Sequence, residues 1–186
     1  IFADNLELEY RGKQVFKGNV GIHHPTNINS LRMNANCELL HIDTLLFTNI
    51  LSQLPNLSIK LPTPIANLEY IDYVGNITGN LNDLKLNGSF LTSQGSININ
   101  GTFQYANTEK KLAFSTQIAT DSFHLGKTLA NKDFGEIIFD ATINGTLDST
   151  RTFLGNSDIH IQQFYYKNYI YNDINIGVRL DTHEMH

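Results

Sequence analysis

The stretch "LKLNGSFLTSQGSININGTFQY", residues 84–105, contains the pattern that decides the fold. Apolar residues occupy alternate positions on both sides of a polar turn at 92–95, namely Leu84, Leu86, Phe90, Ile97, Ile99 and Phe103. Alternation with a period of two places the apolar side chains on one face of a β-strand and the polar side chains on the other. The stretch therefore predicts an amphipathic β-hairpin, and this hairpin carries no obvious reactive group.

The same alternation recurs along most of the chain and predicts a mainly β, antiparallel fold. The connecting runs are rich in Asn, Gly, Asp, Thr and Lys, and we interpret the Asn-Gly pairs at 87–88 and 100–101 as turn or bulge dipeptides. The alternating apolar positions outside the opening hairpin are Leu6, Leu8, Tyr10, Phe16, Val20, Ile22, Leu31, Met33, Ala35, Cys37, Leu39, Leu112, Phe114, Ile118, Ile137, Phe139, Ala141, Ile143, Ile159, Ile161, Ile174, Ile176, Val178 and Leu180.

An amphipathic sheet must cover its apolar face by packing on a second sheet, closing into a barrel or curling around something. Gly18, Gly88 and Gly101 share the apolar phase, and glycine within a strand commonly marks a bend or a bulge. We therefore expect a curved antiparallel sheet that forms a groove. An ordinary sandwich of bulged strands is the alternative that the residues leave open.

Helical spacing breaks the alternation in two places. One short helix is expected at about 44–54, and a short helical insertion is expected near 122–131. Pro62 and Pro64 suggest an extended connector between two parts of the chain. We divide the chain into 1–66, with strands and the first helix, and 67–186, with the second sheet region. Together they are expected to form one continuous, elongated groove.

The composition excludes several classes of protein. A net charge of −5 in 186 residues gives no basic surface for nucleic acid. The single cysteine, Cys37, rules out an intrachain disulfide framework and is expected to be a buried structural thiol. No apolar run approaches the ~18 residues that a membrane-spanning helix needs. Because the first residues have the pattern of a strand, we interpret the chain as a piece of a longer protein.

No catalytic, dinucleotide, phosphate-loop or metal-ligand motif is present in the sequence, so we predict no enzyme activity and no cofactor. A metal-dependent enzyme would require His41 or His160 to meet a carboxylate. The run "FYYKNYIYND", 164–173, could form a sugar-stacking platform from Tyr165, Tyr166, Tyr169 and Tyr171. We favour a plain hairpin with its turn at Lys167 and Asn168 and with cross-strand tyrosine pairs.

Four short patterns occur in the segment 123–180: "FHLG" at Phe123–Gly126, "DFG" at Asp133–Gly135, "INGTLD" at Ile143–Asp148 and the tyrosine hairpin at Tyr166–Ile176. In these patterns the segment resembles the repeats of the TamB branch of the AsmA-like family, the Bacteroidetes type in particular. The likeness extends over most of 68–180 and includes the strands around the opening hairpin. The N-terminal membrane anchor and the C-terminal domain typical of the family are missing from this sequence, as expected for a mid-chain fragment.

The resemblance implies a long, groove-shaped sheet, often described as a β-taco, in the periplasm of a Gram-negative bacterium. It implies a parent chain anchored in the inner membrane and without enzymatic activity. The implied role is phospholipid transport to the outer membrane, outer-membrane protein assembly, or both, with an outer-membrane barrel (TamA-like) as partner. Membrane contact would come through the missing parts of the parent chain.

The groove would take up either phospholipid acyl chains or unfolded outer-membrane protein strands, and the residues do not choose between them. Alternation places the groove lining at Phe90, Ile97, Ile99, Phe103, Phe114, Ile118, Ile137, Phe139 and Ile143. The alternative function is a structural or glycan-binding β-sandwich module of a bacterial envelope or surface protein, with a filled core and converging tyrosines.

Overall fold

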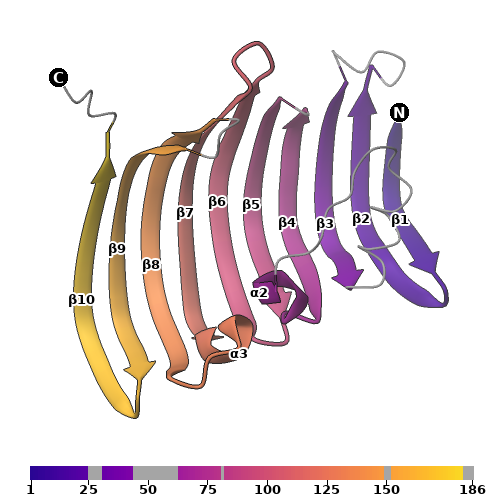
Figure 1. Cartoon of the computed structure of the whole chain (residues 1–186). Helices are drawn as coiled ribbons and strands as arrows, with labels where there is room; N and C mark the ends of the chain where they lie inside the picture. The colour runs from indigo at the N-terminus through magenta and orange to yellow at the C-terminus, as the bar shows by residue number, and fades with distance from the viewer. Residues whose placement is uncertain (25–30, 44–62, 81, 149–151, 182–186) are drawn as a thin grey trace.

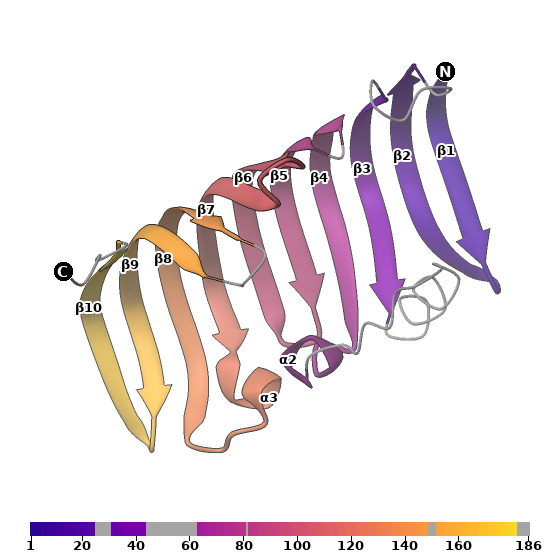
Figure 2. The same cartoon turned by 45° about the horizontal axis from the view of Figure 1, so that its top comes forward.

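Ten strands pair in the order in which they follow one another along the chain, so each strand is antiparallel to its neighbours (Figure 1). The computed structural model describes residues 1–24, 31–43, 63–80, 82–148 and 152–181. The sheet is open, with β1 and β10 at opposite edges, and the strands are bent along their length (Figures 1 and 2). The mainly β, antiparallel class is confirmed, and the groove stays a prediction.

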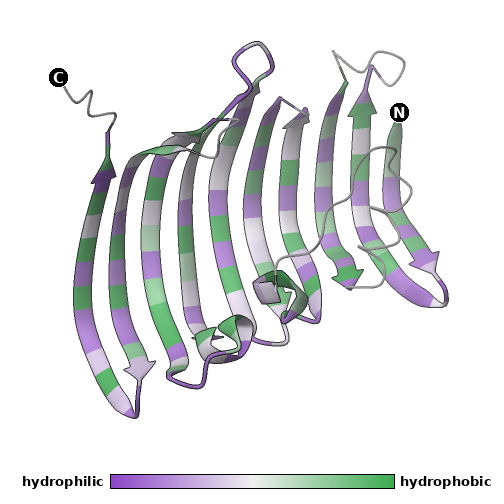
Figure 3. Ribbon diagram, in the orientation of Figure 1, coloured by the Kyte–Doolittle hydropathy of each residue, from purple (hydrophilic) through white to green (hydrophobic). Residues whose placement is uncertain are grey.

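The strands are nine to fourteen residues long and alternate in hydropathy along their length (Figure 3). Their bounds are β1 Phe2–Tyr10, β2 Lys13–His23, β3 Arg32–Asp43, β4 Tyr70–Asn80, β5 Asp83–Thr92, β6 Gly95–Ala106, β7 Lys111–His124, β8 Phe134–Leu147, β9 Phe153–Tyr166 and β10 Tyr169–Leu180. Two short helices, α2 Thr63–Ala66 and α3 Leu125–Leu129, complete the described structure.

The pairing register gives the sheet two chemically different faces, because residues opposite one another on neighbouring strands point to the same side. We call the side that carries Phe90, Ile97 and Phe123 the apolar face. The opposite side, which carries Asn87 and Asn100, is the polar face. The alternation predicted from the sequence is thus kept across the sheet, except where a register shift reverses it.

Burial comes from lateral packing on the apolar face, since no second sheet packs on it in the described part of the chain. The buried apolar side chains, all on this face by register, are Phe16, Ala35, Cys37, Tyr73, Phe123 and Ala141. The most buried of them, Tyr73, is 2% exposed and packs on Phe90 with ring centroids 5.0 Å apart. Its hydroxyl donates to the Asn76 carbonyl at 2.8 Å.

Glycine makes room for the Tyr73 ring. Gly75 and Gly88 face one another on β4 and β5, and Tyr73 lies against both. A Cβ on Gly88 would lie 2.9 Å from the tyrosine hydroxyl and 2.2 Å from the Val74 carbonyl oxygen, and Gly75 also has a φ of +146°. Side chains larger than hydrogen therefore do not fit at either position.

The pairing register corrects two expectations. Leu39 was expected in the apolar phase, but a shift between Cys37 and Leu40 places Leu40 opposite Phe16 on the apolar face and Leu39 opposite Lys17 on the polar face. The Asn-Gly pairs at 87–88 and 100–101 are neither turns nor bulges, because both lie in mid-strand where β5 and β6 pair without a shift.

The two helices lie together at one end of the sheet (Figures 1 and 2). The Asn67 side-chain amide donates to the Thr128 carbonyl at 2.9 Å, and this bond ties the turn after α2 to α3. Helix α3 falls within the expected insertion at 122–131. Pro64 belongs to the first turn of α2, so the expectation of an extended connector there was wrong. The helix expected at 44–54 and Pro62 lie outside the described residues.

The boundary expected between 1–66 and 67–186 does not interrupt the sheet. Strand β3 pairs with β4 from Met33 opposite Gly79 to Asp43 opposite Tyr70. The strands on both sides of the boundary therefore belong to one sheet.

Candidate functional site

The nine residues predicted to line a groove lie on one face of the sheet. Direct cross-strand pairs join them within the set, for example Phe90 opposite Ile97 and Phe103 opposite Phe114. Ile118 lies opposite Ala141 on β8, which shares its side with the remaining members, Ile137, Phe139 and Ile143. The register thus brings all nine together over β5 to β8.

One row on the apolar face crosses all ten strands without a polar side chain. Each member lies opposite the next in the pairing register, so the row runs perpendicular to the strands. It consists of small residues over β2 to β5 and mainly of isoleucine from β6 onward: Leu6, Gly18, Cys37, Gly75, Gly88, Ile99, Ile118, Ala141, Ile159 and Ile176. Nine intervals of ~4.8 Å make this apolar floor about 43 Å long.

Aromatic rings flank the apolar row. Phe114 stacks on Phe103 at 6.5 Å and on Phe153 at 5.9 Å, measured between ring centroids. A second group near the other end of β8 joins Phe134, Phe164 and Tyr166. These contacts hold the side chains of the face against one another, and they leave the outer surface of the rings available to a ligand.

A hollow on the apolar face lies over β1 to β3 and has a volume of about 410 Å³. None of the nine predicted lining residues borders it, so this hollow adds a second part of the apolar face to the predicted lining. The alternation of Leu6, Leu8, Phe16 and Val20 is the sequence pattern that could have predicted an apolar surface at this end of the sheet. The residues that line the hollow are Leu6, Leu8, Val15, Phe16, Val20, Leu40, His41 and Ile42.

The polar face carries a row of side-chain amides that the sequence analysis missed. Five asparagines and one glutamine lie opposite one another across six consecutive strands, in the order Asn19, Asn36, Asn76, Asn87, Asn100 and Gln117. We call these six residues the amide row. Their positions in the sequence show no fixed spacing, because strand lengths and bulges differ, so only the register reveals the row.

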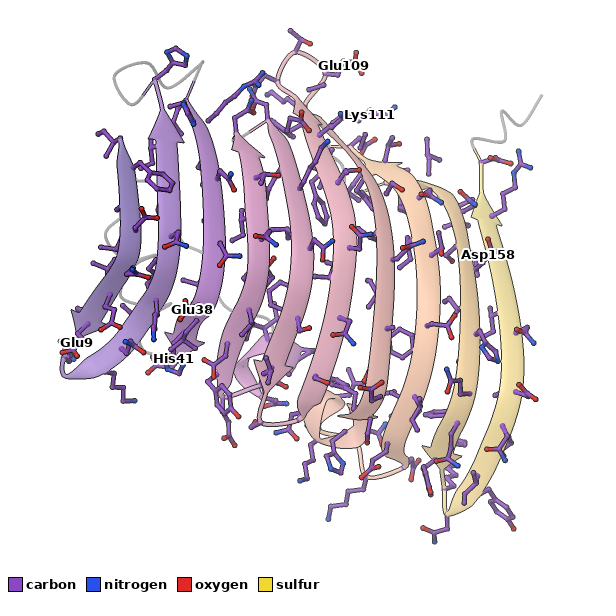
Figure 4. The ribbon with its side chains drawn as sticks, turned by 180° about the vertical axis from the view of Figure 1, so that it is seen from behind. Glu9, Glu38, His41, Glu109, Lys111 and Asp158 are labelled. Atoms are coloured by element: carbon purple, nitrogen blue, oxygen red, sulfur yellow. The ribbon has the colours of Figure 1, made fainter. Side chains whose placement is uncertain are left out.

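Histidine lies next to carboxylates at three places on the polar face, and Figure 4 labels the first of them, His41. His41 Nδ1 is 2.5 Å from Asp72 Oδ1. His124 Nε2 is 3.3 Å from Glu136 Oε1. His160 bridges two strands, with Nδ1 3.2 Å from Asp140 and Nε2 3.1 Å from Asp173. Hydrogen bonding to Asp173, and then to Asp140, raises the pKa of His160. No group of three or more His, Cys, Asp or Glu among the described residues is arranged to hold a metal ion.

The tyrosine run forms the expected hairpin, with its turn at Lys167 and Asn168. Tyr166 lies opposite Tyr169, so these two share a face. Tyr165 is opposite Ile170 and points to the other face. The glycan-binding alternative requires the four tyrosines to converge on one platform, and they do not.

Cys37 is 3% exposed, and burial raises the pKa of its thiol. The thiol lies in the apolar packing of β2 to β4, as expected for a structural cysteine.

Comparison with family models, with curated proteins and with solved structures finds no match for this chain. Among the described residues, no helix has the length and apolar character needed to cross a membrane.

Proposed function

We propose that this chain is a segment of a TamB-branch, AsmA-like protein and that its apolar face carries phospholipid acyl chains between the inner and outer membranes. The observation that supports this proposal most directly is the apolar row, which continues from β1 to β10 on an open sheet. The resemblance of 123–180 to the family's repeats supports the same proposal and supplies the periplasmic setting and the outer-membrane barrel partner.

The energetic argument rests on burial of methylene groups. Moving one CH₂ from water to an apolar surface gains about 0.8 kcal/mol, so a bare chain of ~16 methylenes would face a barrier of roughly 13 kcal/mol in an aqueous gap. An uninterrupted apolar floor removes much of this barrier along its whole length. The headgroup can stay in water beyond the edge of the face, so the mechanism requires no reactive or headgroup-binding residue.

The same surface could take up an unfolded outer-membrane protein strand, because the edges β1 and β10 carry backbone groups available for pairing. We favour acyl chains because the apolar row runs perpendicular to the strands. A ligand that lies along this row contacts each strand once, as a flexible hydrocarbon can. An added strand would lie parallel to β10 or β1 at an edge.

Photo-crosslinking in Gram-negative cells tests the proposal. A photoreactive residue replaces Phe90, Phe114 or Phe139 in the full-length protein, and Thr142, which lies opposite Gln117 on the polar face, serves as the control. Capture of radiolabelled phospholipid at the three apolar positions and not at Thr142 is the expected result. Absence of lipid at all positions, in a protein that folds, would contradict the proposal.

A further inference from the structure

The amide row lies on the face that the proposed lipid function does not use, and it is unusual for a β-sheet. Asparagine is depleted in strands because its side chain competes for backbone hydrogen bonds. A solvent-facing position needs only some polar residue, and Thr or Lys would suit the strand better. Asparagine or glutamine in register on six strands therefore requires a further reason.

Half of the amide row is satisfied within the chain. Asn36 donates to Asn76 through their side chains at 2.9 Å, and Asn19 accepts the backbone N–H of Asn5 at 2.8 Å. The side-chain amides of Asn87, Asn100 and Gln117 have no hydrogen-bond partner among the described residues. Each amide offers two donors and two acceptor lone pairs. This half of the row therefore presents a set of free, uncharged hydrogen-bonding groups.

A hollow lies directly over the free half of the row, on β5 to β8, with a volume of about 490 Å³. Polar side chains at its border include Asn87, Asn98, Asn100, Gln117 and Thr142. Asp140 is the one charged residue that lines it, and this carboxylate already contacts His160. The hollow thus suits a neutral ligand rich in hydroxyl or amide groups.

We propose that the free half of the amide row binds a linear, uncharged glycan. Neighbouring strands are ~4.8 Å apart, which is similar to the length of one sugar unit, so successive units can meet successive strands. A nucleic acid does not fit, because the chain has a net charge of −5 and no basic group borders the hollow. A hydrocarbon does not fit either, because it would leave the amides unsatisfied. The proposal stands independently of the lipid function, which concerns the opposite face.

Calorimetric titration of the purified chain with cellohexaose, chitohexaose and maltohexaose tests the proposal. The double variant Asn87→Thr/Asn100→Thr removes two free amides and introduces a residue that strands favour, so the fold is kept. The matched control is Asn34→Thr, on the polar face but outside the row and the hollow. Circular dichroism and urea unfolding verify that all variants fold.

The expected result is binding of at least one hexasaccharide by the wild type and by N34T, with affinity about ten-fold weaker in the double variant. This binding should change little with salt, because the glycan carries no charge. Absence of binding to all three sugars, or equal binding by the double variant, would overturn the proposal. Lipid capture at Phe114 should be the same in all variants, which separates this test from that of the lipid function.

Discussion

At the scale of single residues, Tyr73 is the most buried apolar side chain, and it packs over Gly75 and Gly88. Replacement of Gly88 by Ala brings a methyl group against backbone atoms of β4, which cannot move without distorting the ladder. We expect G88A to lower the free energy of unfolding by about 1–3 kcal/mol in urea titrations. The control is Gly177→Ala on β10, where the nearest atom lies 3.7 Å away. Equal stability of G88A and wild type would contradict the packing described.

At the scale of single residues, His160 also makes the stability of the folded protein depend on pH. Its pKa is raised above the ordinary 6.5 by hydrogen bonds to Asp173 and Asp140. A raised pKa in the folded state means that the stabilisation is fully present below pH 6.5 and is lost as the pH rises through the folded pKa. In an NMR titration of the His160 ring, we expect Asp173→Asn to lower the pKa toward the ordinary value. Asn175→Asp, which adds a carboxylate opposite His160 on β10, should raise it further. An unchanged pKa in D173N would refute the bridge.

At the scale of elements, the turn between β9 and β10 has a testable geometry. Lys167 and Asn168 both have positive φ, 48° and 66°, as a type I′ turn requires. We expect Asn168→Gly to hold or raise the unfolding free energy and Asn168→Val to lower it by about 1 kcal/mol, since a β-branched residue disfavours this conformation. Thermal unfolding of the two variants measures the difference. A more stable valine variant would show that the turn has another geometry.

The strands themselves could be predicted from the sequence, because alternation such as Ile97, Ile99 and Phe103 has a direct physical cause in the pleat. Strand order and register could not, since a single extra residue reverses the two faces, as Leu39 and Leu40 show. The Asn-Gly pairs that begin at Asn87 and Asn100 were wrongly predicted to be turns or bulges, again because the sequence does not show how the strands pair. The local Asn-Gly signal favours a turn, and the ladder of paired neighbours overrides it.

The candidate site was predictable only in part. Parity alone assigned Phe90, Phe114 and Phe139 to one side. The apolar hollow over β1 to β3 and the amide row both depend on which residues lie opposite one another, and the pairing of distant strands supplies this information.

At the scale of the whole molecule, the apolar face raises the question of what covers it in water. Side chains on the edge strands remain well exposed, 46% for Leu8 and 40% for Ile176. Apolar patches of more than a few hundred Å² are rare on soluble monomers and mark sites of association. We therefore expect an isolated chain to bind a lipid, a detergent or another copy of itself through this face.

We expect the purified chain to self-associate without lipid and to return to its monomer mass of 21.0 kDa when a mild detergent covers the apolar face. Light scattering coupled to size-exclusion chromatography measures this change. Ile176→Lys should reduce the association, whereas Asn175→Lys, its neighbour on the polar face, should not. A monomer at all concentrations, free of bound lipid, would mean that the apolar face is covered in another way.

The most direct test of the central claim is binding of a fluorescent fatty acid to the purified chain, with the same charge placed on either face of one strand. Phe114 and Ser115 are adjacent on β7 and lie opposite Phe103 and Thr102, on the apolar and polar faces respectively. We predict that Phe114→Asp weakens binding about ten-fold or more, because it places a carboxylate beside the acyl chain, and that Ser115→Asp binds as the wild type does. Equal binding by the two variants, or no binding by the wild type, would contradict the account.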